Sequence, residues 1–218
     1  MKTLLTGGTG LLGTHLLDIR DYISPSRLEM DITDERSVMS CLEKYKPDVI
    51  LHSAAYTDTL APETNSEEAV CCYKTNVLGT RNIVDYAGNA SIIYISSEST
   101  VNPYNFYSNT KLHGEQEVKK HHSYMIVRTS FRQNPFQYDV AFEDMYTIAD
   151  SVDVIANLID KLVDLPTENK IIYVGTGVKT VYELAKKTRP DIIPGSRKSF
   201  ANNIPSLVEL LNIPQFYP

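Results

Sequence analysis

The chain has 218 residues, a hydrophobic fraction of 42% and a formal net charge of -6 at pH 7. This length predicts one domain, or one domain with a small appendage. The acidic balance and the lack of a basic run exclude a typical nucleic-acid partner. No apolar stretch reaches transmembrane length, and a glycine turn interrupts the N-terminal apolar run too early for a signal peptide, so we expect no membrane partner.

The cysteine and histidine content predicts neither a disulfide framework nor a metal site. Cys41, Cys71 and Cys72 are too few for a framework and predict a reducing, cytoplasmic compartment. The adjacent Cys71 and Cys72 would suit redox chemistry, but we favour two buried helix residues. The five histidines are scattered, without metal-ligand spacing.

A glycine-rich turn follows the first apolar run. Glycines recur at Gly7, Gly10 and Gly13, and helical leucine spacing begins at Leu11. In a strand–turn–helix unit, backbone N–H groups at the helix N-terminus can bind a pyrophosphate. The alternative is a glycine turn in some other α/β protein; we favour dinucleotide binding because the turn directly follows a strand.

The second strand, Tyr22-Ile23, is very short, and Ser24, Ser26 and Arg27 follow it. NAD-selective folds usually place a carboxylate here, whereas two hydroxyls and a guanidinium suit a 2′-phosphate. We therefore expect NADP(H) to be favoured over NAD(H). A solvated loop arginine is an alternative of equal weight.

The remaining chain alternates helical and strand patterns. We expect helices over 10–21, 34–45 (capped by Thr33), 66–87, 107–121, 151–163 and 180–187, and strands over 49–52, 91–96 and 171–174. The small residues after strand 49–52 would let a cofactor approach the backbone. Asn76, inside helix 66–87, could be exposed or could face that site.

Tyr107 and Lys111 lie four residues apart and would share one helix face. An ordinary tyrosine has a pKa of about 10, and a nearby cation lowers it toward the range useful for proton transfer. The preceding strand ends in serines, and alternation favours Ser97 over Ser96 for orienting a substrate oxygen. Without this context we would favour a surface Tyr/Lys pair.

With these motifs the chain resembles the extended short-chain dehydrogenases/reductases, and more narrowly the dTDP-4-dehydrorhamnose reductase branch of sugar-nucleotide-modifying enzymes. The resemblance rests on residues 6–13, 31–34, 47–50, 54–57, 76–80, 95–97, 107–111, 114–115 and 127–130. The chain departs from the pattern at Ser108, where glycine is usual, at Phe131, where tryptophan often occurs, and in a short stretch between Ser97 and Tyr107.

The resemblance implies an α/β fold with a Rossmann-type doubly wound parallel sheet. Residues 1–130 would form the NAD(P)-binding core, and 131–218 a small, reduced C-terminal substrate-binding portion interleaved with the last strand and helices of that core. The implied activity is reduction of a nucleotide-linked 4-keto-6-deoxy sugar, with hydride from the nicotinamide and a proton from Tyr107. The alternatives are a non-catalytic NAD(P)-binding regulatory subunit and a sugar-nucleotide epimerase.

The same resemblance assigns site residues. The catalytic set is Ser97, Tyr107 and Lys111. The cofactor set is Gly7, Thr9, Gly10, Leu11, Leu12, Gly13, Ser24, Arg27, Asp31, Ile32, Ala54, Ala55, Tyr56, Asn76, Tyr107 and Lys111. Substrate candidates are Glu98, Arg132, Asn134 and Arg189, and Arg197 is a further candidate for a diphosphate, although each arginine could instead be solvated. By analogy, the helices around Asn76 and Tyr107 would form a homodimer face.

Overall fold

Five parallel strands form the centre of the computed structural model, which describes residues 1–196. Their order is β1 (Thr3–Thr6), β2 (Val49–His52), β3 (Ser91–Ser97), β4 (Tyr124–Thr129) and β9 (Lys170–Val174). On the other side of β1, Ile23 adds a single parallel bridge to Leu4. The central strands read as continuous apolar runs because helices cover both faces of the sheet.

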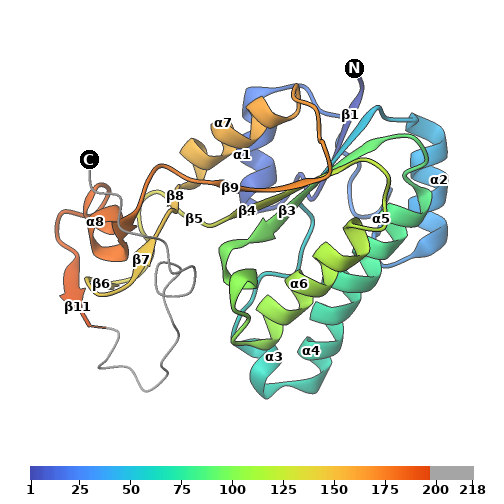
Figure 1. Ribbon diagram of the computed structural model, residues 1–218. Helices are drawn as coiled ribbons and strands as arrows, with labels where there is room; N and C mark the ends of the chain where they lie inside the picture. Colours follow the sequence, from blue (N-terminus) through green and yellow to red (C-terminus); the bar gives the residue numbers. More distant parts are fainter. Residues whose placement is uncertain (197–218) are drawn as a thin grey trace.

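Helices pack on the two faces in separate sets (Figure 1). α1 (Leu11–Ile19) and α7 (Val152–Leu162) cover one face, where Leu16 and Ile155 are fully buried. α2 (Glu35–Tyr45), α5 (Thr80–Tyr86) and α6 (Phe106–Val118) cover the other. The predicted Rossmann-type doubly wound sheet is therefore confirmed. Its chain reverses between β1 and β2, and ligands bind at such switch points.

Two predicted helices differ in detail. The helix expected over 66–87 consists of α4 (Ser66–Tyr73), a π-helical turn η1 (Lys74–Gly79) and α5. The N-cap of α2 is Asp34 rather than Thr33, because the Asp34 carboxylate accepts from the backbone N–H groups of Arg36 and Ser37. Of the two adjacent cysteines, Cys72 is buried but Cys71 is exposed, so that expectation was wrong for Cys71.

Short elements complete the described chain. They are α3 (Ala61–Thr64), the 3₁₀ turn η2 (Glu98–Val101), β5 (Phe131–Arg132) paired with β8 (Asp150–Ser151), β6 (Val140–Phe142) with β11 (Ile193–Gly195), β7 (Tyr146–Thr147) with β10 (Lys179–Thr180), and α8 (Val181–Lys186). A small apolar cluster joins Phe136, Ala185 and Ile192. None of the helices within residues 1–196 has the length and apolar character needed to cross a membrane.

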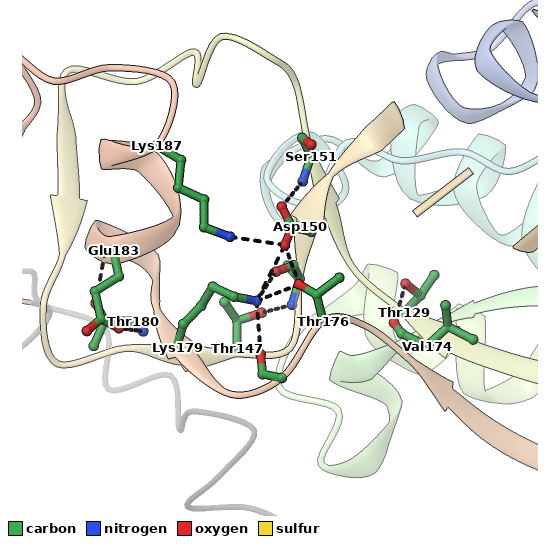
Figure 2. A network of polar contacts seen from close by, with 12 residues as sticks. Thr129, Thr147, Asp150, Ser151, Val174, Thr176, Lys179, Thr180, Glu183 and Lys187 are labelled. Atoms are coloured by element: carbon green, nitrogen blue, oxygen red, sulfur yellow. Dashed lines mark hydrogen bonds and ion pairs between the residues drawn. The ribbon is translucent and has the colours of Figure 1, made fainter. Parts of the chain in front are cut away.

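A polar network around Asp150 ties β8, β9 and α8 together (Figure 2). The Asp150 carboxylate accepts from the Thr176 hydroxyl, from the Ser151 N–H at 2.9 Å and from Lys187 Nζ at 3.3 Å. Lys179 Nζ donates to the Ala149 carbonyl at 2.8 Å and lies 3.8 Å from Asp150. Burial acts to raise the pKa of Asp150, but these donors hold it below its ordinary value. The network fixes the short C-terminal elements beside the sheet.

A buried ion pair fixes α6 on the sheet. Glu115, fully buried, accepts from Arg128 Nη2 at 2.7 Å, and its Oε1 accepts from the hydroxyls of Ser96 at 2.6 Å and Thr100 at 3.0 Å. Burial acts to raise the pKa of Glu115, but Arg128 and the hydroxyls hold it below its ordinary value. Because Glu115 lies one turn after Lys111, the pair sets how α6 presents its residues to the carboxyl end of β3.

Glu115→Gln leaves the Arg128 guanidinium buried without its counter-charge. We expect this variant to lose about 3 kcal/mol of unfolding free energy, measured by urea denaturation at neutral pH. The matched control is Glu168→Gln, which breaks an exposed pair with Lys170 and should lose less than about 0.5 kcal/mol. Equal losses in the two variants would contradict the structural importance of the buried pair.

Candidate functional site

A cavity of about 630 Å³ opens at the carboxyl ends of β1 to β4. Most of the residues expected to contact a cofactor line it: Gly7, Thr9, Gly10, Leu11, Leu12, Gly13, Arg27, Asp31, Ile32, Ala54, Ala55, Tyr56, Tyr107 and Lys111. Ser97, Glu98 and Arg132 line it as well. The cavity therefore brings together segments that lie far apart in the sequence.

The glycine turn forms the floor of this cavity by close backbone contact. Gly7 has φ +77°, and a Cβ there would lie 2.7 Å from the backbone N and Cα of Ala54. A Cβ on Gly13 would lie 2.1 Å from the Gly7 carbonyl oxygen. No side chain caps the N-terminus of α1 at Gly10, so its first N–H groups face the cavity side without a capping partner. This arrangement fits a dinucleotide pyrophosphate.

The rim near Asp31 would meet the adenosine part of a dinucleotide. Thr33 donates to Asp31 Oδ1 through its hydroxyl at 2.7 Å and its N–H at 2.9 Å, and Arg27 Nε lies 3.4 Å from Oδ2. Burial acts to raise the pKa of Asp31, but the Thr33 donors and Arg27 bring it below its ordinary value. Ser24 does not line the cavity: its hydroxyl lies 2.0 Å from where a Cβ on Gly8 would be. The structure thus keeps Arg27 at the rim and removes Ser24 from it.

Asn76 supports the cavity wall instead of lining it. It is 1% exposed, accepts from the Tyr56 N–H at 2.8 Å and donates to the Tyr56 carbonyl at 3.1 Å. Its amide also donates to the Thr110 hydroxyl at 3.0 Å. The assignment of Asn76 as a direct cofactor contact is therefore corrected: it holds the backbone of Tyr56, which does line the cavity.

The hydroxyl groups expected to act on a substrate lie at the end of β3. Ser96 donates to the buried Glu115, whereas Ser97 lines the cavity, shares a 2.8 Å hydrogen bond with the Ser99 hydroxyl and interacts with Tyr107. Burial raises the pKa of Tyr107 to about 12, and the Ser97 hydrogen bond acts in the opposite direction. The phenol therefore holds its proton at neutral pH.

Lys111 is buried beneath this end of the cavity. It is 2% exposed, its Nζ donates to the Ile95 carbonyl at 2.8 Å, and it lies 4.2 Å from the centre of the Tyr94 ring. Burial lowers the pKa of Lys111 to about 7, although Glu115 acts to raise it. The expected lowering of the Tyr107 pKa by Lys111 is not found in this structure: burial dominates both groups and moves the Tyr107 pKa upward.

The four substrate candidates separate into two pairs. Glu98 lines the cavity, and the Thr147 hydroxyl donates to its Oε1 at 3.0 Å; burial raises the pKa of Glu98, with Arg132 opposing. Arg132 also lines a second cavity of about 260 Å³ beside Asp150 and Lys187. Asn134 is exposed and lines neither cavity.

Arg189 is also outside both cavities. Its guanidinium pairs with Asp191 at 2.9 Å and Asp139 at 3.5 Å, so it braces the small C-terminal cluster. Neither Asn134 nor Arg189 is placed to meet a ligand in the large cavity. Arg197 lies outside the described residues.

Some lining residues were not anticipated. Thr75, Tyr104, Phe131 and Met145 line the large cavity. Tyr104 stands three residues before Tyr107, so its position could have been suspected from the sequence. Thr75 reaches the cavity from the π-helical turn, and Met145 arrives from the segment before β7, and no sequence pattern marked either.

Comparisons with known proteins agree with this geometry. A family model described as the RmlD substrate binding domain matches residues 1–139. The chain is 27% identical over 236 residues to GDP-6-deoxy-D-talose 4-dehydrogenase of Aggregatibacter actinomycetemcomitans, covering 84% of this chain and 79% of that protein. It is 28% identical over 145 residues to methionine adenosyltransferase 2 subunit beta of Danio rerio, covering 55% of this chain and only 44% of that protein.

A solved structure extends the likeness to the whole fold. It is dTDP-4-dehydrorhamnose reductase from Bacillus anthracis str. Ames, crystallised in complex with NADP. It superposes with a TM-score of 0.79 at 25% identity, covering 94% of this chain and 88% of that one. The glycine turn of the present chain, with its bare helix N-terminus, is consistent with binding of a nicotinamide dinucleotide.

Gly7→Ala should abolish this binding, because its Cβ would collide with the backbone of Ala54 and the φ of +77° disfavours alanine. We expect NADPH affinity, measured by fluorescence titration, to fall by at least about tenfold, together with a lower midpoint of thermal unfolding. Gly88→Ala is the matched control, since Gly88 also has positive φ (+58°) but nothing within 4 Å of a new Cβ. Equal losses of NADPH affinity in both variants would contradict a specific role for the Gly7 contact.

Lys111→Met should stabilise the free protein at neutral pH. The pKa of Lys111 is near 7 in the folded state against an ordinary 10.5, so between these values the unfolded chain binds more protons and wild-type stability rises with pH. The urea-measured advantage of the methionine variant should therefore be largest at about pH 7 and narrow by about pH 9.5. Lys119→Met, at an exposed position, should show no such pH-dependent gain. A variant less stable than wild type at pH 7, or an advantage that grows with pH, would show that burial does not depress this pKa.

Proposed function

Because this chain belongs to the RmlD substrate binding domain family, we propose that it is a nicotinamide-dependent reductase of a nucleotide-linked 4-keto-6-deoxy sugar. The observation that carries the proposal is one cavity with two different ends. One end has the glycine turn and Asp31, suited to a dinucleotide; the other has Ser97, Tyr107 and Lys111, suited to a carbonyl group. The reductase from Bacillus anthracis with a similar fold supports this reading.

A bound nicotinamide supplies the hydride in this chemistry. Ser97 would orient the keto oxygen of the sugar by a hydrogen bond, and Tyr107 would donate the proton that this oxygen requires. A Tyr107 pKa near 12 keeps the donor loaded at neutral pH, and a developing alkoxide is basic enough to take its proton. Lys111, held on the Ile95 carbonyl, would contribute positive charge beneath the ring when protonated.

We further propose NADPH as the favoured cofactor. The Arg27 side chain is 81% exposed, and its 3.4 Å pair with Asp31 is weak enough to be exchanged for a 2′-phosphate. The NADP complex of the Bacillus anthracis reductase supports the same choice. Asp31, fixed by Thr33, would then accept from adenosine hydroxyl groups or be screened by Arg27.

At the substrate end, Glu98 and Arg132 remain as the proposed contacts. Glu98 presents an acceptor for sugar hydroxyls, and Arg132, shared by the two cavities, is placed to meet a diphosphate. The substrate would therefore extend from Tyr107 toward the short C-terminal elements. The division of the chain into a core and a reduced substrate portion is part of this proposal.

A second function is favoured by one observation. The match to methionine adenosyltransferase 2 subunit beta raises the possibility of a non-catalytic subunit that binds a dinucleotide and lends its surface to a partner. Retention of Ser97, Tyr107 and Lys111 around one cavity favours the reductase. NADPH binding without turnover of any nucleotide-linked keto-sugar would select the subunit instead.

Tyr107→Phe should lower kcat for reduction of a dTDP-linked 4-keto-6-deoxy sugar by about 10²–10⁴-fold, because only the proton donor is removed. Cofactor affinity should stay within about threefold of wild type, since the ring is retained. Turnover is followed by loss of NADPH or NADH absorbance, and affinity by fluorescence. Tyr104→Phe removes the other phenol of the cavity and should have a much smaller effect on kcat. If Tyr104→Phe rather than Tyr107→Phe abolished turnover, the assignment of the donor would be wrong.

A further inference from the structure

His52 is a buried histidine that the proposed chemistry does not use. It ends β2, is 0% exposed, and lies between two threonine hydroxyls: Nδ1 is 2.7 Å from Thr6 Oγ1, and Nε2 is 3.1 Å from Thr80 Oγ1. Burial lowers the pKa of His52 to about 3, and Lys111 lowers it further, so the ring is neutral at physiological pH. A neutral ring has one donor and one acceptor nitrogen, and its neighbours decide which is which.

The neighbouring hydrogen bonds determine the direction of the whole chain. The Ala54 N–H donates to Thr6 Oγ1 at 3.1 Å, which leaves the Thr6 proton for His52 Nδ1. At the far end, the Thr80 hydroxyl donates to the Asn76 carbonyl at 2.8 Å, so Thr80 Oγ1 must accept from His52 Nε2. The two ends independently require the same tautomer, with the proton on Nε2.

This chain connects the two sides of the proposed cofactor cleft. Thr6 is the last residue of β1 and leads into the glycine turn, and Ala54 forms the wall against which Gly7 packs. Asn76 holds the backbone of Tyr56, the next part of that wall. The ring of His52 therefore acts as a spacer between the turn, the wall and the π-helical turn η1.

We propose that His52, as the Nε2–H tautomer, is a positioning residue that sets the spacing between the glycine turn and the wall formed by residues 54–56. It touches neither cofactor nor substrate and acts through Thr6, Ala54 and Asn76. The inference rests on the proposed cofactor site for its consequence, but the tautomer itself does not. A small shift of the wall would misplace a bound dinucleotide relative to Tyr107 and Ser97.

The first test is the protonation of the ring in the unliganded wild-type chain. Nitrogen-15 NMR of histidine-labelled protein, assigned with His52→Gln, should show a protonated Nε2 and an unprotonated Nδ1 that do not change between about pH 5 and 9. A proton on Nδ1, or a ring that titrates in this interval, would overturn the proposal whether or not the protein is a reductase.

The second test compares two replacements of the ring. His52→Gln keeps an acceptor and a donor, whereas His52→Leu removes both and leaves the threonine hydroxyls unpaired. At a temperature where both variants are folded, we expect the leucine variant to lose about tenfold in NADPH affinity and about 10²-fold in kcat, with substantial rescue in the glutamine variant. Thr80→Val, which breaks the chain outside the cavity, should change NADPH affinity in the same direction as His52→Leu.

The outcomes separate this inference from the proposed function. Equal NADPH affinity and turnover in the leucine and glutamine variants would overturn the positioning role while leaving the reductase intact. A wild-type protein that binds NADPH but has no turnover would overturn the reductase, and the affinity difference between the variants would still decide the role of His52. A wild-type protein that binds no dinucleotide would overturn both.

Discussion

The contact between the glycine turn and the backbone of Ala54 is the constraint on which the site depends. The ends of β1 and β2 approach so closely that no side chain fits between them at Gly7. The bare N-terminus of α1 therefore lies directly opposite the wall after β2, and the cavity opens between them. The carboxyl ends of β3 and β4 then close the same cavity with hydroxyl groups and a phenol. A parallel sheet with a switch point places these four ends together by topology alone.

Burial controls the electrostatics of the reactive end more strongly than pairing does. Tyr107 and Lys111 share a helix face, yet the lysine donates to the Ile95 carbonyl and lies over the Tyr94 ring. In this state both groups favour their neutral forms, the phenol above its ordinary pKa and the amine below it. The neighbouring Glu115 stays ionised because Arg128 accompanies it into the interior. The site thus keeps one complete ion pair and one nearly neutral lysine side by side.

Much of this arrangement could be predicted from the sequence, because it depends on local patterns. The apolar run at residues 49–52 is the strand β2, and the glycine spacing does open a helix. The π-helical turn at Lys74–Gly79 could not be predicted, since it depends on Asn76 bonding a distant backbone segment. Arg189 was placed wrongly for a similar reason: its acidic partners at Asp191 and Asp139 matter only after the C-terminal elements fold together. Charge and residue type indicate candidates, but tertiary partners decide which of them face a ligand.

The nearly neutral Lys111 ties occupancy of the cavity to solution acidity. Its ammonium form is disfavoured mainly by burial, and any anion that enters the cavity would favour that form again. Loading the site with a dinucleotide at mildly alkaline pH would therefore take up protons from the buffer, even though the dinucleotide itself does not titrate there. Ligand capture and protonation would then be one coupled equilibrium, whose apparent affinity declines as the medium becomes more basic.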